Sequence, residues 1–467
     1  MGNTSKKLAA KCTLLTREEQ KNVAATFRAA SRNSEKIRED DLIVSGKLDA
    51  VSLEKFWGPQ IDPRLAQYLS NYLFGFGPNK TQTVDFNRFA ELYVYNVRGT
   101  LDERVTATYN SLALSEGVEL PYQLLKEYCE SLASTYIKII KSSPADRNAI
   151  WLQKGFSGSA SHVQSLGEAV AATVWANNGP NDAPGQTVTL NELTKWLQTN
   201  TLLPQLSELV FSSLYGIVRR HVDDVEHHNM SLLPYPEGLE SMPDYPAITD
   251  ISHVAWLNSQ LPSKLQHKWR FLFSSHIHGE SFSTMAGRII DQGPSVMIIQ
   301  DTNNYIFGGF ATDSWSISAN WVGNDTSFLF TLVPKMRCYP ATSYNDHYQY
   351  MNHHTKTMPN GIIMGGQFEF AGIFISADPF GDGSSAESCT TYRGYRRLSK
   401  EGGFKIRAIE VWGVGEKPLL DKEEMRRAPS KPSKKISVLD THAQDRLVLD
   451  LMGKKTTASD GYRDENK

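Results

Sequence analysis

The spacing of hydrophobic residues changes near residue 235 and divides the chain into two kinds of structure. Before that point apolar residues recur at helical spacing, as in the stretch 206–218. After about residue 240 they follow strand patterns, and the stretches 296–300 and 305–311 flank a polar turn typical of a hairpin. Glycine pairs punctuate the strand candidates that follow, which favours an antiparallel sandwich. The pattern therefore predicts an α+β chain, with an all-helical N-terminal half and a C-terminal β-sandwich.

Caps and breaks set the predicted boundaries. Thr16 with Glu19 and Thr189 with Glu192 have the spacing of capping boxes, so a helix is expected after each pair. The proline-rich stretch 233–238 breaks any helix. The predicted segments are an N-terminal segment 1–12, a helical domain 13–140, a helical extension 141–235, a β-rich domain 236–415, a charged linker 416–435 and an amphipathic helix 436–453.

Two stretches of the helical half have the outline of EF-hand loops. In the first, Asp41, Gly46 and Leu48 have the acid, glycine and apolar spacing of such a loop, and the second covers 77–88. Most calcium ligands are missing, because the closing position holds Ser52 in the first loop and an arginine in the second. We expect an EF-hand-like pair that binds calcium poorly, and two unrelated helical hairpins are the alternative.

The C-terminal stretch 436–453 forms an apolar stripe at helical spacing beyond a linker rich in charge and proline. Such a helix docks either on its own domain or on a partner, and we expect a partner. The predicted partner-binding residues are Leu439, Ala443, Leu447, Val448, Leu451 and Met452.

The N-terminus predicts a lipid attachment. Removal of Met1 would expose Gly2 among small polar residues, which suits N-myristoylation, although Lys6 stands where the motif has serine or threonine. One myristoyl chain binds membranes only marginally, so a second attachment is needed. The lysines at 6, 7 and 11, an acyl chain on Cys12, or a protein partner could each supply it.

Composition narrows the class of protein without naming a function. The 467 residues carry 49 basic and 51 acidic side chains, a net charge of −2 that argues against a bulk nucleic-acid binder. With 40% hydrophobic residues and four separated cysteines, the chain is neither disordered nor a disulfide scaffold. No apolar run is long enough for a transmembrane helix, and no signal peptide is visible.

Groups able to perform catalysis are sparse. No phosphate-binding loop or nucleophile elbow is found. His276 and His278 would share a face if they lay on a strand, but a third metal ligand is not evident. We therefore expect no catalytic residue, no metal and no cofactor. The alternative is an enzyme protecting against oxidative stress, which would use Cys338, Cys389 or the histidine pair and would need a thiol of lowered pKa.

Between about residues 240 and 415 the chain resembles the TLDc domain of the oxidation-resistance proteins. The resemblance rests on Gly293–Ile299 with Phe307–Trp315, and on three further pieces in order: Trp269–Ser275, Gly365–Gly366 with Gly372–Phe374, and Cys389–Tyr392 before Ile409–Gly413. The glycine run is shorter here than in many members. The family implies a two-layer β-sandwich edged by helices, protection against oxidative stress, and binding to the vacuolar proton-pumping ATPase.

The layout of the whole chain resembles the lysosomal, MTOR-associated branch of that family. This resemblance implies an N-myristoyl group on Gly2, MTOR pathway components as further partners, and a place on the cytoplasmic face of the lysosomal membrane with a cytosolic pool. The expected function is that of a membrane-associated regulator without enzymatic activity and without a nucleic-acid partner.

Overall fold

The structure, a computed structural model, describes residues 15–31, 46–76, 80–112, 119–142, 146–175, 187–217, 232–242, 244–356 and 358–418. Contacts group the chain into two units. The described parts of Met1–Leu272, with Asn304–Phe307 and Phe330–Tyr339, form the first, and Phe273–Asn303, Gly308–Leu329 and the chain from Pro340 form the second.

The first unit is mostly helical, as the apolar spacing predicted. Its helices are α2 (Arg17–Ala30), α3 (Ala50–Trp57), α4 (Pro63–Phe74), α5 (Phe86–Val97), α6 (Leu101–Leu112), α7 (Tyr122–Ser142), α8 (Asp146–Gln153), α9 (Ala160–Ala172), α10 (Leu190–Thr199), α11 (Leu202–Leu214) and α12 (Ile251–Gln260), with short 3-10 turns η3 (Thr173–Trp175) and η5 (Ser263–Leu265). Both predicted capping boxes are confirmed, at the starts of α2 and α10.

Four two-residue strands link these helices in pairs. β1 (Leu48–Asp49) pairs antiparallel with β2 (Thr83–Val84), and β3 (Leu120–Pro121) pairs in the same way with β4 (Thr187–Val188). The longer β5 (Tyr235–Glu237) runs parallel to β6 (Lys268–Ser274). The β1–β2 ladder and the β3–β4 ladder each hold two helix–loop–helix elements together, which is how paired EF-hand loops are joined.

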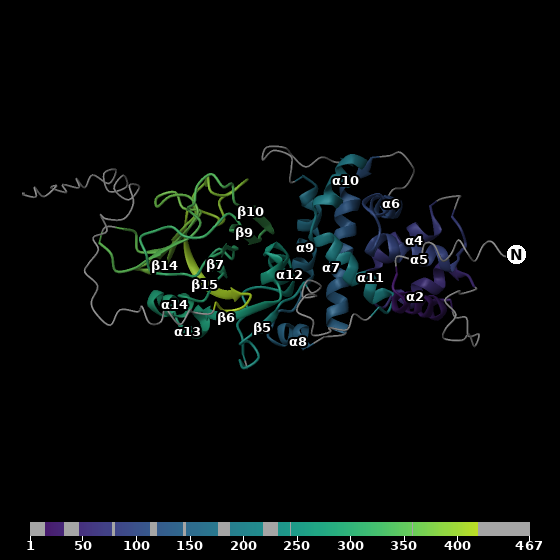
Figure 1. Ribbon diagram of the computed structural model, residues 1–467, viewed down its shortest axis with the longest axis horizontal. Coiled ribbons are helices and arrows are strands. Elements are labelled where there is room, and N and C mark those ends of the chain that lie inside the picture. Colours follow the sequence, from purple (N-terminus) through teal and green to yellow (C-terminus); the bar gives the residue numbers. More distant parts are fainter. Residues whose placement is uncertain are drawn as a thin grey trace, which may run out of the picture. The chain divides into compact units, whose positions relative to one another are not determined.

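Close packing of α7 against α9 forms the centre of this unit, and Figure 1 shows the two helices side by side. Gly167 of α9 lies against α7, where an added Cβ atom would stand 2.3 Å from Cα of Glu130. Only glycine permits this approach, because real Cβ atoms do not come so close to a neighbouring backbone.

The C-terminal region forms a curled antiparallel sheet, which confirms the mixed α+β class. The strand order is β10 (Arg337–Pro340), β9 (Phe328–Val333), β8 (Ile306–Ala311), β7 (Ser295–Asp301), β15 (Gly403–Val414), β14 (Phe380–Ser384), β13 (Ile373–Ala377), β12 (Gly361–Met364), β11 (Tyr350–Asn352). The predicted hairpin of 296–311 is present as β7 and β8.

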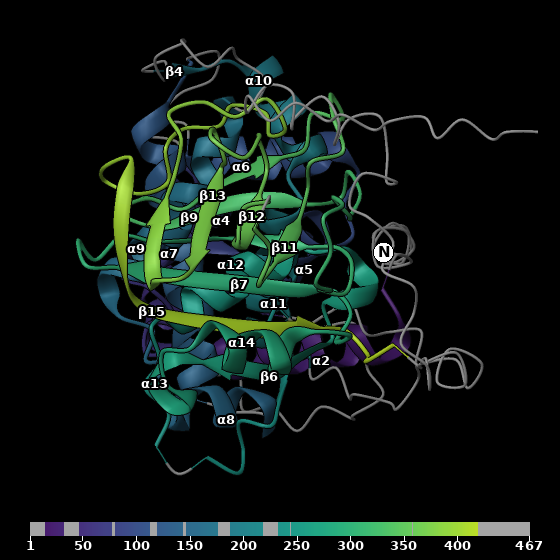
Figure 2. The same ribbon diagram turned by 90° about the vertical axis from the view of Figure 1, so that its left-hand side faces the viewer.

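The long strand β15 turns the sheet. Its first residues pair with β14, and from Ile406 onward it pairs with β7, with a register shift between Ile406 and Ala408. Such an irregularity bends a strand and increases its twist. Figure 2 shows the result, with β12 and β13 running across the direction of β7 and β15.

The two histidines singled out in the sequence do not lie on a strand, so the condition for a shared face is not met. His276 and His278 belong to the one-turn helix α13 (Ser275–His278), which follows β6 and precedes α14 (Phe282–Ile289). Side chains two residues apart on a helix point in different directions, so His276 and His278 do not have the shared face that a metal site would need.

Candidate functional sites

The predicted attachment sites lie outside the described residues. These are Gly2 with its neighbouring lysines and Cys12, and the stripe Leu439, Ala443, Leu447, Val448, Leu451 and Met452. The structure leaves both predictions as they stand. It does describe the EF-hand-like elements apart from residues 41–45, which include Asp41, and 77–79, and it describes His276, His278 and three of the cysteines.

The first EF-hand-like exit helix is capped by the carboxylate of Asp49, a residue of its loop. Asp49 accepts hydrogen bonds from the backbone N–H of Ser52 at 2.9 Å and from the Ser52 hydroxyl at 3.0 Å. These bonds lower the pKa of the Asp49 carboxyl. Ser52, at the closing position of the loop, is thus a donor to Asp49, where a calcium loop would have a bidentate carboxylate.

In the second loop a cationic side chain stands at the closing position. The guanidinium of Arg88 donates to the carbonyl of Tyr72 at 2.7 Å, lies 4.2 Å from the centre of the Tyr72 ring, and pairs with Glu91 at 3.2 Å. Arg88 therefore ties the exit helix α5 to the entering helix α4. A positive charge in this position opposes the binding of a cation. The contacts of Arg88 hold the two helices together, as a bound cation would.

The apolar groove between the helices of this first pair is filled by the end of α11. Tyr215 donates its hydroxyl to the carbonyl of Phe89 at 2.7 Å, and its carbonyl accepts from Thr26 at 2.8 Å. The indole N–H of Trp57 donates to the carbonyl of Leu214 at 3.0 Å. Calcium sensors use such a groove to bind a target helix once the metal opens it. Here the chain's own helix occupies it.

These observations predict that calcium does not regulate the helical unit. Thermal unfolding in calcium and in a chelator should give the same midpoint, because Ser52 and Arg88 supply no ligand. Replacing Arg88 with glutamine should lower the free energy of unfolding by about 1 kcal/mol in both buffers, since its charged hydrogen bonds are partly exposed. A midpoint that rises with added calcium would contradict this.

The second ladder, β3 with β4, shows an EF-hand-like pair that the sequence analysis missed. Its loops do not have the spaced acids by which such loops are found. The remaining clue was the β-branched pair Thr187–Val188 directly before the capping residue Thr189. Glu192 holds the closing position after this strand, but its carboxylate already accepts from the Thr189 backbone N–H at 2.9 Å and hydroxyl at 2.8 Å.

A buried histidine joins the starts of α9 and α12. His253 is fully buried, and its Nδ1 accepts from the backbone N–H of Asp250 at 3.1 Å. Burial, with the nearby His162 ring at 4.4 Å, lowers the pKa of His253 to about 3. Although burial opposes it, the His162 ring 3.7 Å away and hydrogen bonds from the backbone N–H groups of Ser252 and Ser159 hold the pKa of Asp250 well below its ordinary value.

This cluster makes the first unit sensitive to acid. Unfolded His253 takes up a proton below its ordinary pKa of 6.5, whereas the folded protein does not until about 3, so stability falls as the pH drops through that window. Between about pH 6.5 and about pH 5 the loss should be about 2 kcal/mol. In urea unfolding, a His253→Gln variant should lose less stability over this range than the wild type. Equal losses would show that His253 is not the cause.

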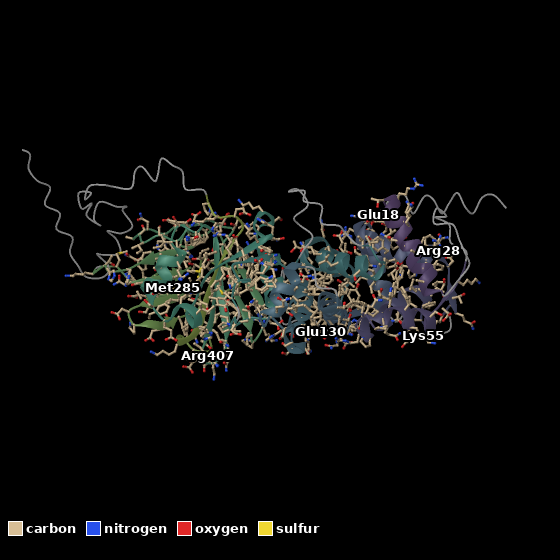
Figure 3. The ribbon with its side chains drawn as sticks, turned by 90° about the horizontal axis from the view of Figure 1, so that it is seen from below. Glu18, Arg28, Lys55, Glu130, Met285 and Arg407 are labelled. Atoms are coloured by element: carbon tan, nitrogen blue, oxygen red, sulfur yellow. The ribbon has the colours of Figure 1, made fainter. Side chains whose placement is uncertain are left out.

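A cleft of 540 Å³ opens between α7, the start of α9 and the start of α4, near Glu130 in Figure 3. Arg64 bridges Asp62 at 3.2 Å and Glu130 at 2.9 Å across its wall. Lys138 and Lys141 donate to the carbonyls of Ile61 and Gly158. Because these charged groups already have partners, we assign the cleft a structural role.

The enzyme alternative requires a thiol of lowered pKa, and none of the three described cysteines has one. Burial raises the pKa of Cys338 to about 12 and also raises those of Cys129 and Cys389. The ring of His278 stacks on Phe273, and its Nδ1 accepts from the backbone N–H of Ser274. A raised pKa keeps a thiol protonated and inert.

Within the described ranges, no three histidine, cysteine, aspartate or glutamate side chains are grouped so that they could hold a metal ion. No helix among the described residues combines the length and apolar character needed to cross a bilayer.

Comparison with known proteins identifies related chains. Residues 242–415 match the TLDc domain model. The MTOR-associated protein MEAK7 of Gallus gallus is 31% identical over 376 residues, covering 79% of this chain and 76% of that protein. The human MEAK7 protein is 26% identical over 476 residues, covering 99% of both chains. Nuclear receptor coactivator 7 of Mus musculus is 28% identical over 178 residues, covering 38% of this chain and 18% of that protein.

Proposed function

Because the chain belongs to the family of the TLDc-containing MTOR-associated protein MEAK7, we propose that it is a non-enzymatic regulator that binds the vacuolar proton-pumping ATPase. It acts at the cytoplasmic face of the lysosomal membrane, alongside a cytosolic pool, and there supports MTOR signalling. The comparisons support an MTOR-related TLDc protein.

One observation carries this proposal: the similarity to MTOR-associated relatives runs through the helical half as well as the TLDc domain. The names of those relatives describe association with MTOR. The described part of the chain supports the same kind of role, since its cysteines have raised pKa values and the groove of its first EF-hand-like pair is filled. In this proposal, surface residues and the two ends of the chain attach the protein to its membrane and its partners.

The C-terminal stripe is the proposed contact with the ATPase. Its spacing predicts a short amphipathic helix, and a helix of this length gains stability only when its apolar face is buried. Deletion of residues 436–467 should abolish recovery of ATPase subunits in a pull-down from lysosomal extracts, with the full-length chain as control. Undiminished recovery would remove the helix from the ATPase contact.

Acylation of Gly2 is the proposed membrane attachment. A Gly2→Ala variant cannot be myristoylated and should shift from the lysosomal membrane fraction to the cytosolic pool. Its pull-down of detergent-solubilised ATPase should stay unchanged, because the C-terminal stripe is intact. If the variant stayed on membranes as the wild type does, the acyl group would not be the attachment.

A further inference from the structure

A cluster of exposed cations lies on one loop of the second unit. The loop 393–400, here called the basic loop, connects Tyr392 to the start of β15. Four of its eight residues are cationic, and all four are exposed: Arg393, Arg396, Arg397 and Lys400. Two acidic residues adjoin them, Glu387, which is 3.9 Å from Arg397 and 90% exposed, and the exposed Glu401 directly after Lys400.

The basic loop is fixed on the sheet by its other side chains. The hydroxyl of Tyr395 donates to the carbonyl of Gly372 at 2.9 Å and also bonds the hydroxyl of Ser385 at 2.8 Å. Leu398 is 1% exposed, and its backbone N–H donates to Ser385 at 3.0 Å. These uncharged residues hold the backbone of the basic loop on the sheet, and its four cations remain exposed to solvent.

A large apolar side chain stands beside this anchor. Phe370 is 64% exposed and comes two residues before Gly372, whose carbonyl receives the Tyr395 hydroxyl. The backbone around it is held, since the N–H of Phe370 donates to the carbonyl of Gln367 at 3.1 Å. At this exposure most of the Phe370 ring lies outside the core of its own domain.

We propose that the basic loop and Phe370 form a binding surface for anionic phospholipid membranes. Segments that lie in a membrane interface typically combine arginine and lysine with a protruding aromatic residue. The cations then lie on the headgroups and the ring lies at the boundary of the acyl chains. Each cation near a negatively charged leaflet strengthens binding about fivefold. This surface needs neither the acyl group on Gly2 nor the ATPase, so it goes beyond the proposed function.

The test uses the full-length Gly2→Ala protein, so that no acyl chain contributes, in a sedimentation assay with vesicles. It should bind vesicles that contain phosphatidylserine, bind pure phosphatidylcholine vesicles far less, and lose affinity as salt screens the charges. The variant R393Q/R397Q/K400Q should bind about a hundredfold more weakly, from about fivefold per charge. Phe370→Ser should weaken binding about tenfold.

A matched control removes three exposed lysines from the helical unit, K47Q/K55Q/K195Q; Figure 3 labels Lys55 among them. It changes the net charge equally and should leave vesicle binding unchanged. The proposal is overturned if the loop variant binds phosphatidylserine vesicles like the control. It is also overturned if the loop variant binds vesicles normally but loses ATPase in a pull-down, because the basic loop would then be a protein contact.

Discussion

Replacing Tyr215 with alanine is expected to lower the free energy of unfolding of the helical unit by about 3–5 kcal/mol, the range for truncating a buried aromatic side chain. Tyr215 is 0% exposed and contacts two helices of the first EF-hand-like pair, α3 through the ring of Trp57 and α5 through the rings of Phe89 and Tyr93. Truncation leaves a cavity where these rings meet. It also removes the donor to the carbonyl of Phe89.

Urea unfolding followed by tryptophan fluorescence measures this loss. Tyr215→Phe keeps the ring and removes only the hydroxyl, so it should cost about 1 kcal/mol. Tyr344→Ala, at a tyrosine that is 80% exposed, should change stability by less than about 0.5 kcal/mol. If Tyr215→Ala were as mild as Tyr344→Ala, α11 would not be filling the groove.

Gly167→Ala should destabilise the same unit by about 3 kcal/mol, although alanine is the better helix former by about 1 kcal/mol. The new Cβ would stand 2.3 Å from Cα and 2.5 Å from N of Glu130, and backbone atoms of α7 cannot turn aside as a side chain can. The two helices would have to separate along their contact. That movement would disturb packing along both helices.

Gly287 of α14 provides the matched control. A Cβ added there meets nothing within 4 Å, so Gly287→Ala should raise stability by up to about 1 kcal/mol. Chemical denaturation of the two variants should give changes of opposite sign in the free energy of unfolding. A stabilising Gly167→Ala would mean that α7 and α9 do not approach as closely as described.

Local sequence patterns predicted the local structure well. The capping boxes at Thr16 and Thr189 act within one helical turn, so their spacing alone identifies them. The hairpin of β7 and β8 is encoded in the same way, by two apolar runs about a polar turn. The sequence also predicted the family from motifs in the TLDc region, and the comparisons confirm it.

Contacts between distant residues could not be predicted in this way. Thr26 and Tyr215, which close the groove, are 189 positions apart, and no spacing rule relates them. The second EF-hand-like pair was missed because its loops lack the spaced acids that identify such loops. The helix α13, which contains His276 and His278, was not predicted, because a helix of one turn leaves no hydrophobic periodicity in the sequence.

The helical unit thus holds two pairs of EF-hand-like elements, of which the first has an arginine in place of a metal ligand and an internal helix in place of a target. We infer that it serves as a calcium-independent scaffold. In the proposed function, binding to the ATPase then depends on the C-terminal stripe.

Binding of the purified full-length protein to purified vacuolar ATPase tests the proposed function most directly. We expect the wild type to bind and the variant L447D/L451D to bind at least about a hundredfold more weakly, because the substitutions would remove two leucine side chains from an apolar interface. The control D445N/D450N changes two acidic residues away from the apolar stripe and should bind like the wild type. Failure of the wild type to bind, or equal binding by L447D/L451D, would contradict the proposed function.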